Sequence, residues 1–254
     1  TVISNSYGIA GETPFQELYN AHYDHPGVAV VVASGDIGNL QSYPATHPDV
    51  IAVGGTRLTR DSSPRGWSET AWVNAGSGCS LYEPRPEYQA GVDTRCGDKR
   101  ATADISAVAD PESGLAVYNT LGQDGWAQWG GTSLAAPLVA GMYALAGDPL
   151  PGSYPVTYPY RKDKTAGLFD ITEGSNGWCG DLLCNAGPGW DGPTGLGSPN
   201  GVSALTLGAT GRITGTVTTG RTNGAVAGAT VTATDGTGAA FRATTDAQGR
   251  YDLR

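Results

Sequence analysis

One serine in this chain stands in the segment Gly130-Gly131-Thr132-Ser133-Leu134-Ala135-Ala136-Pro137. The two glycines allow a tight turn and a close approach of substrate to the backbone. Ser133 then stands at the expected start of a helix, because the run from Leu134 to Leu145 is small and apolar enough to be a buried one. Free N–H groups at a helix start favour developing negative charge. The pattern is typical of a nucleophilic serine held at the start of a helix. Taken alone, it fits equally well a loop that caps an ordinary core helix.

An aspartate provides the second chemical candidate. The run from Val28 to Val32 is apolar and mostly β-branched, which predicts a buried parallel strand. Asp36 follows it in the glycine-flanked turn Ser34-Gly35-Asp36-Ile37-Gly38. Open α/β sheets build their sites at the carboxyl ends of such strands. The alternative is a turn or capping aspartate, which is common.

Together the two motifs, Ser-Gly-Asp-x-Gly and later Gly-Thr-Ser-x-Ala-x-Pro, resemble the sedolisin family of serine-carboxyl peptidases. Two further segments, Tyr43 to Thr56 and Asp104 to Pro111, resemble family segments in the family's order. The resemblance implies an endopeptidase in which Ser133 is the nucleophile and Asp36 helps to form the oxyanion hole. A carboxyl group donates a hydrogen bond to an oxyanion only when it is protonated, so we expect an acid optimum.

The histidines separate this chain from a subtilisin, which would share the serine motif. A subtilisin needs a histidine base and has an asparagine amide at the oxyanion position, where this chain has Asp36. The only histidines are His22, His25 and His47, and none stands in a subtilisin-like histidine motif. We expect all three to lie in surface loops.

The general base of the family is not found in these residues. Sedolisins activate the serine with a Glu-x-x-x-Asp pair on one helical face, upstream of the region matched here. No aspartate of this chain has a glutamate four residues before it. The opening run from Thr1 to Gly8 resembles an internal strand of the family. We therefore expect an excerpt of a longer protein, inactive by itself.

A glycine-rich segment near position 190 suggests a metal site. Carboxylates and backbone carbonyls suit calcium, and glycine turns can aim successive carbonyls at one point. By its resemblance to sedolisins, the chain is expected to hold a structural Ca²⁺ through the carboxylates of Asp170 and Asp191 and the carbonyls of Ile171, Gly187 and Gly189. Without that resemblance, a loop with no metal is the simpler interpretation.

The four cysteines indicate disulfides. We expect the pairs Cys79–Cys96 and Cys179–Cys184, because each closes a local loop in a polar surface segment. Zinc is the alternative, but the chain has no Cys-x-x-Cys pair and no histidine beside the cysteines. Disulfides favour an oxidising compartment and hence a secreted, extracellular protein.

Composition narrows the partners. The chain has 24 acidic against 15 basic residues, a net charge of -9, which argues against nucleic acid. No apolar run is long enough to span a membrane. A protein or peptide substrate is the expected partner.

The last part of the chain changes character. From position 208 to 254, Thr and Val alternate between glycine turns, which is typical of a β-sandwich. The pattern Thr-x-Asp-x-x-Gly-x-Tyr, which runs from Thr244 to Tyr251, resembles the carboxypeptidase regulatory-like domain, an all-β prealbumin-like sandwich, here incomplete. We expect a spacer or a surface-binding appendage, with an extracellular polymer as one candidate partner.

The elements that must position the site follow from these patterns. We expect residues 1–207 to form an α/β peptidase domain with a subtilisin-like, mostly parallel sheet and flanking helices. The predicted strands are Val2 to Tyr7, Val28 to Ala33, Val50 to Val53, Ile105 to Ala109 and Leu115 to Tyr118, and the helices are Pro14 to Asn20 and Leu134 to Leu145. The rival interpretation is a non-catalytic extracellular binding or adhesion protein with a degenerate peptidase fold.

Overall fold

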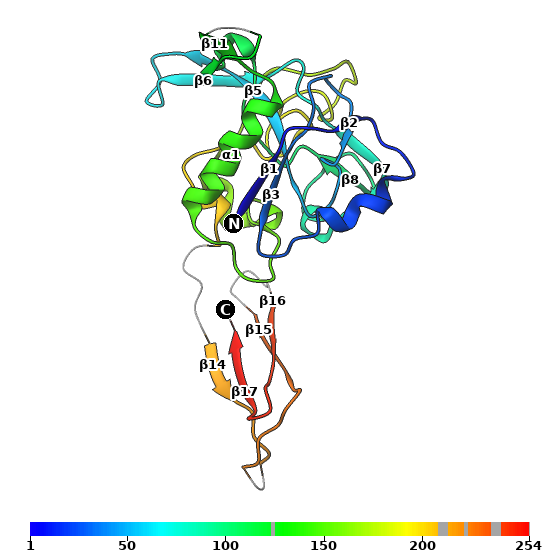
Figure 1. Ribbon diagram of the computed structural model, residues 1–254, viewed down its shortest axis with the longest axis vertical. Helices are drawn as coiled ribbons and strands as arrows, with labels where there is room; N and C mark the ends of the chain where they lie inside the picture. Colours follow the sequence, from blue (N-terminus) through cyan, green and yellow to red (C-terminus); the bar gives the residue numbers. More distant parts are fainter. Residues whose placement is uncertain (123–124, 208–212, 221–222, 235–239, 254) are drawn as a thin grey trace. The chain divides into compact units, whose positions relative to one another are not determined.

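The structure of the 254-residue chain is a computed structural model that describes residues 1–122, 125–207, 213–220, 223–234 and 240–253 (Figure 1). The chain divides into two compact units, Thr1–Leu207 and Gly208–Arg254. Residues 208–212, where the second predicted domain begins, lie outside the described residues. Each unit is described by itself.

A five-stranded sheet forms the centre of the first unit. Its strands are β1 (Val2–Asn5), β3 (Ala29–Ala33), β5 (Ile51–Arg60), β6 (Trp67–Ala71) and β9 (Ile105–Val108). They run in the order β1-β3-β5-β6, and β9 also pairs with β5. β1, β3, β5 and β9 are parallel, whereas β6 pairs antiparallel with the second half of β5. The predicted mostly parallel sheet is confirmed.

The apolar run of β3 is buried on both faces, as its composition predicts. Val31 lies in the core cluster that receives Ala136 and Val139 from helix α1 (Thr132–Ala146). Val30 and Val32 point to the opposite face. Figure 1 shows α1 lying along β1 and β3. Small residues on the buried side of α1, among them Ala135, Ala136 and Ala140, let the helix pack closely on the sheet.

Two predicted elements differ in the structure. The strand predicted at Leu115 to Tyr118 does not join the parallel sheet: β10 (Leu115–Asn119) pairs antiparallel with β11 (Gly125–Trp129). The partner is adjacent in sequence, so a hairpin closes a shorter loop than a place in the sheet would require. The helix predicted at Pro14 to Asn20 is a short 3₁₀ helix, η1 (Gln16–His22), whose N-cap residue Phe15 provides no side-chain cap.

The other elements of this unit are short. They are β2 (Ile9–Ala10), β4 (Ser42–Tyr43), β7 (Gly78–Pro84), β8 (Lys99–Thr102), β12 (Leu168–Phe169), β13 (Ser198–Pro199), η2 (Glu87–Gln89), η3 (Pro111–Ser113), η4 (Pro155–Thr157), η5 (Lys162–Gly167) and η6 (Ser203–Leu205). Within the described residues, no helix has both the length and the apolarity needed to cross a membrane.

Strands are the only regular elements among the described residues of the second unit. β14 (Ile213–Thr216) pairs antiparallel with β17 (Arg250–Leu253), and β15 (Thr230–Thr234) pairs with β16 (Ala240–Thr244). Exposed and half-buried residues alternate along β15 and β16, as the Thr and Val pattern predicts. The prealbumin-like sandwich stays a prediction.

Candidate active site

Ser133 lies in the first turn of α1 and is exposed. The residue before the helix, Gly131, has a φ of 92°, in the left-handed region that favours glycine. A Cβ added there would also lie 2.7 Å from Asp36 Oδ2. Gly131 therefore serves two purposes: it starts the helix and leaves room for the carboxyl group of Asp36.

Pro137 changes the hydrogen bonding of the same helix turn. A proline has no N–H, so it cannot bond the carbonyl four residues earlier, which belongs to Ser133. Ser6 Oγ, just after β1, donates to this Ser133 carbonyl at 3.1 Å. Among the described residues, no acceptor bonds the backbone N–H of Ser133. Ser133 is thus tied through its carbonyl to the residue that follows β1, while its N–H bonds no acceptor in the described part of the chain.

Asp36 follows β3 and turns back toward the start of α1. Its Oδ1 accepts hydrogen bonds from Thr132 N at 2.7 Å and from Thr132 Oγ1 at 2.8 Å. Thr132 Oγ1 in turn accepts from Gly35 N at 3.1 Å, and Thr132 is buried. Both of these hydrogen bonds from Thr132 end on Oδ1, and Oδ2 accepts neither of them.

Ser133 and Asp36 line the same cavity, of about 240 Å³. Its lining residues are Ser6, Tyr7, Gly8, Ala10, Ala33, Gly35, Asp36, Ile37, Leu40, Ser42, Thr132 and Ser133. The structure therefore brings together the two residues that the sequence singles out for chemistry. The sequence reasoning missed the roles of Ser6 and Thr132, although the Gly-Thr-Ser motif contained Thr132.

No histidine takes the place of a base beside Ser133. Within the described part of the chain, neither a histidine nor a carboxylate hydrogen bonds to the Ser133 hydroxyl. His47, predicted in a surface loop, is instead buried, with 3% of its surface exposed, and its Nδ1 accepts from Asp49 N at 3.2 Å. Burial lowers the pKa of His47 to about 4, which makes it a neutral core residue. That prediction was wrong because turn residues next to prolines gave no sign of the packing of Tyr23 against His47.

The predicted calcium residues gather in one loop region. Asp191 is fully buried, and its carboxylate accepts from Gly187 N at 3.1 Å and from Thr194 N at 2.9 Å and Oγ1 at 2.8 Å. Asp170, which is exposed, accepts from Gly189 N at 3.0 Å. Ile171 is buried beside Asp170. The carboxyl groups of Asp170 and Asp191 thus face the same turn.

The electrostatics of this turn fit a hard cation. The pKa of Asp191 is raised to about 7, chiefly by burial and to a smaller extent by the negative charge of Asp170. The hydrogen bonds from Thr194 and Gly187 lower this pKa but do not offset the burial. A bound cation would favour both ionised carboxylates. No three side chains of the types His, Cys, Asp or Glu cluster within the described ranges, so a metal here would need backbone oxygens as well.

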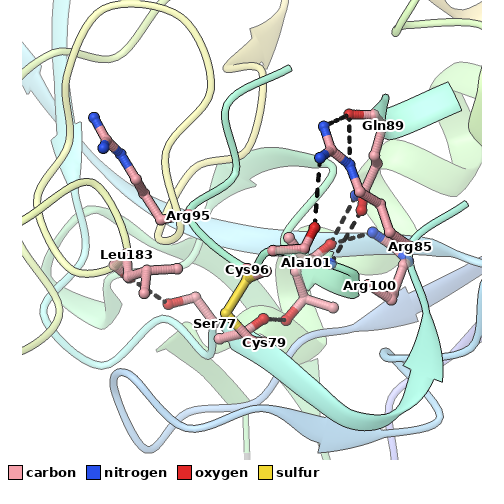
Figure 2. The surroundings of a disulfide bond; sticks show 12 residues. Ser77, Cys79, Arg85, Gln89, Arg95, Cys96, Arg100, Ala101 and Leu183 are labelled. Atoms are coloured by element: carbon pink, nitrogen blue, oxygen red, sulfur yellow. Dashed lines mark hydrogen bonds between the residues drawn. A yellow bond between two sulfur atoms is a disulfide. The ribbon is translucent and has the colours of Figure 1, made fainter. Parts of the chain in front are cut away.

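The four cysteines form the two predicted disulfides. Cys79 bonds Cys96 with an S–S distance of 2.04 Å, and Cys179 bonds Cys184 with one of 2.08 Å. No cysteine is left free, so the zinc alternative is excluded. Figure 2 shows the first disulfide between β7 and the loop before β8.

Comparisons with known proteins identify the family of this chain. The model of the subtilase family matches residues 1–174. Sedolisin of Pseudomonas sp. (strain 101) is 37% identical over 171 residues, covering 62% of this chain and 28% of that protein. Kumamolisin of Bacillus sp. (strain MN-32) is 34% identical over 205 residues, covering 70% and 36%. Tripeptidyl-peptidase 1 of Bos taurus is 31% identical over 211 residues, covering 68% and 36%.

A solved structure extends the likeness to the fold. Pseudomonas sedolisin, described as a serine-carboxyl proteinase complexed with two molecules of pseudo-iodotyrostatin, superimposes with a TM-score of 0.63 at 30% identity, over 80% of this chain and 64% of that one. The chain spans between 28% and 36% of the length of the curated relatives above. With the subtilase match over residues 1–174 and these relatives, the chain belongs to the subtilase family, on its sedolisin branch.

Proposed function

We propose that this chain carries the nucleophile and the oxyanion-stabilising carboxyl group of a secreted serine-carboxyl endopeptidase. The observation that carries the proposal is the shared cavity of Ser133 and Asp36, with Thr132 joining the two. Ser133 Oγ attacks the peptide carbonyl, and the Ser133 N–H and protonated Asp36 Oδ2 donate to the oxyanion. Collapse of the tetrahedral intermediate releases the amine and leaves an acyl-enzyme, which water hydrolyses.

The base in this mechanism accepts the Ser133 proton and passes it to the leaving amine. The described residues place no such group against Ser133. We therefore assign the base to a glutamate outside the 254 residues, in a Glu-x-x-x-Asp pair, and expect the 254-residue chain to be inactive by itself.

The position of cleavage distinguishes two peptidase types. Tripeptidyl-peptidase 1 is among the similar proteins, so removal of N-terminal tripeptides is the second candidate function. An endopeptidase cuts an N-terminally blocked peptide, whereas a tripeptidyl-peptidase does not. Products from one blocked and one free peptide of the same sequence decide between them.

We also propose structural calcium at Asp170 and Asp191, with the carbonyls of Ile171, Gly187 and Gly189. The support is that both carboxylates, that of Asp191 fully buried, accept hydrogen bonds from the same glycine-rich turn. When bound, the ion would cross-link the ends of this loop; it has no part in the chemical steps.

Residues 208–254 are proposed to form a regulatory-like β-sandwich that serves as a spacer or binds an extracellular polymer. The alternating exposure of β15 and β16 supports a sandwich, and the two disulfides support secretion. A non-catalytic binding protein remains the competing function.

Peptide cleavage from about pH 3 to 8, by the longer protein and by its Ser133→Ala variant, tests the proposal. We expect activity with an acid optimum that Ser133→Ala abolishes. Absence of cleavage at every pH by correctly matured protein would favour the binding function instead.

A further inference from the structure

The loop that carries Asp36, residues 35–39, packs against Asn176 and Gly177, which are far away in the sequence. Asn39 N donates to Asn176 O at 2.9 Å. A Cβ added to Gly38 would lie 2.6 Å from this same Asn176 oxygen, and one added to Gly177 would lie 2.9 Å from Asn39 Cβ. The two backbones therefore touch directly, and neither can shift without moving the other.

The side chain of Asn176 makes the next connection. It is buried, with 3% of its surface exposed, and its Nδ2 donates to Ala75 O at 2.6 Å and to Ser77 Oγ at 2.7 Å. Because a carbonyl oxygen only accepts, the contact with Ala75 determines which end of the amide is the NH₂ group. An aspartate at position 176 would place a carboxyl oxygen where the donor now stands.

The segment from Asn74 to Gly76 completes a closed set of hydrogen bonds. Gly38 N donates to Asn74 O at 2.9 Å, and Gly76 N donates to Gly35 O at 2.7 Å. Asn176 thus bonds both the Asp36 loop and the segment on which that loop rests. It is the one residue whose backbone bonds the loop while its side chain bonds the support, within the hydrogen bonds described here.

A disulfide anchors Asn176 itself. Asn176 N donates to Cys184 O at 2.9 Å, and Cys184 is bonded to Cys179. Ser77 Oγ also donates to Leu183 O in the same disulfide loop, at 3.2 Å, a contact visible in Figure 2. Asn176 and Ser77 are therefore hydrogen-bonded to a loop that the Cys179–Cys184 disulfide closes.

We propose that Asn176 is a positioning residue that sets the place of Asp36 in the oxyanion hole. The inference rests on the proposed function. Asn176→Asp removes a group that donates twice: an ionised carboxylate would repel Ala75 O, and a protonated carboxyl can donate to only one of Ala75 O and Ser77 Oγ, so at least one of the two hydrogen bonds is lost. An oxyanion exists only during the reaction, so the loss falls on kcat and leaves KM nearly unchanged.

The test compares Asn176→Asp with Asn74→Asp in the longer, active protein. Asn74 is exposed and bonds the loop only through its backbone carbonyl, so its variant makes the same chemical change next to the same support. We expect kcat of Asn176→Asp to fall about 10-fold to 100-fold, and both constants of Asn74→Asp to stay within about twofold. Unchanged kcat in Asn176→Asp, or a loss seen only in KM, would overturn the proposal.

A double-mutant cycle with Asp36→Ala separates positioning from general damage. If Asn176 acts through Asp36, Asn176→Asp lowers kcat far less in the Asp36→Ala background than in the wild type. Additive losses would mean that Asn176 does not act through Asp36.

Ser77→Ala is a milder second variant for use if Asn176→Asp does not fold. It removes one hydrogen-bond partner of Asn176, and we expect it to lower kcat less than Asn176→Asp does.

Hydrogen exchange provides a readout that needs no activity. In Asn176→Asp we expect faster amide exchange in residues 35–39 and unchanged exchange in β9. If wild type and Ser133→Ala are equally inactive, the proposed function fails, yet the exchange experiment still decides the positioning. Unchanged exchange in residues 35–39 would contradict it.

Discussion

Asp36 receives both of its hydrogen bonds from Thr132 on one carboxylate oxygen, Oδ1, at 2.7 and 2.8 Å. The contact joins the end of β3 to the first residue of α1, although 96 positions separate the two residues. It holds the carboxyl group beside Ser133 and leaves Oδ2 free of these donors. The orientation of Asp36 therefore depends on Thr132, the residue immediately before Ser133.

Thr132→Val tests this relationship, since valine has nearly the same shape but lacks the hydroxyl donor. We expect kcat of the active protein to fall about 10-fold, with KM little changed, because one of two bonds on Oδ1 is lost. Thr132→Ser keeps the hydroxyl and should retain most of the activity. A rise in KM at unchanged kcat would show that Thr132 acts on substrate binding.

Calcium is expected to stabilise the first unit through Asp170 and Asp191. With calcium about 100-fold above its Kd, linkage gives about 2.7 kcal/mol, and a chelator should lower the Tm by roughly 5 to 10 °C. Asp191→Asn should remove the response to calcium, whereas Asp148→Asn, a fully exposed aspartate, should keep it. Calorimetry with and without chelator measures this; an equal response in all three proteins would refute the site.

His47 should make stability fall in acid. Its pKa is lowered by burial to about 4, so the folded state disfavours the protonated ring, and stability is lost as the pH falls from about 6.5 toward 4. Asp49 has the opposite effect on stability. Burial raises its pKa from 3.8 to about 6, so the folded state gains stability as the pH falls from about 6 toward 3.8.

Comparison with His47→Gln isolates the histidine, because Asp49 is present in both proteins. Between pH 7 and 4.5 the wild type should lose about 2 kcal/mol more of its free energy of unfolding than the variant does. Urea denaturation at the two pH values measures the difference. The same pH dependence in both proteins would mean that His47 takes up a proton freely in the folded state.

The two disulfides should differ in what they stabilise. Cys79–Cys96 spans 17 positions and Cys179–Cys184 spans five, so replacing the cysteines by serine should cost about 3 and about 2 kcal/mol respectively. Arg85 also bonds Gln89 O, at 2.6 Å, within the loop that the first disulfide closes (Figure 2).

The kcat of the two double-serine variants should show the opposite order: loss of Cys179–Cys184 should lower kcat more than loss of Cys79–Cys96. The Cys179–Cys184 loop supports Asn176 and hence Asp36, so its loss should lower kcat the more. Denaturation and kinetics of the two double-serine variants give both rankings. A greater loss of kcat on removal of Cys79–Cys96 would contradict this assignment.

Local patterns in the sequence were sufficient for much of the first unit. The glycines before Ser133 and the small apolar residues after it predicted α1, and the run before Asp36 predicted β3. The disulfide pairs followed from cysteines close in sequence. In each case the interactions that determine the element lie between residues close in sequence, or the apolar composition of the segment shows that it is buried.

Other features depend on residues distant in sequence, and only the tertiary structure decides them. The strand at Leu115 found a hairpin partner instead of the parallel sheet, and His47 was buried by Tyr23. Ser6 bonds the Ser133 carbonyl across 127 positions because Pro137 leaves that carbonyl open. The sequence by itself determined which residues could do chemistry; packing decided their orientation, since polar partners are chosen by proximity in space.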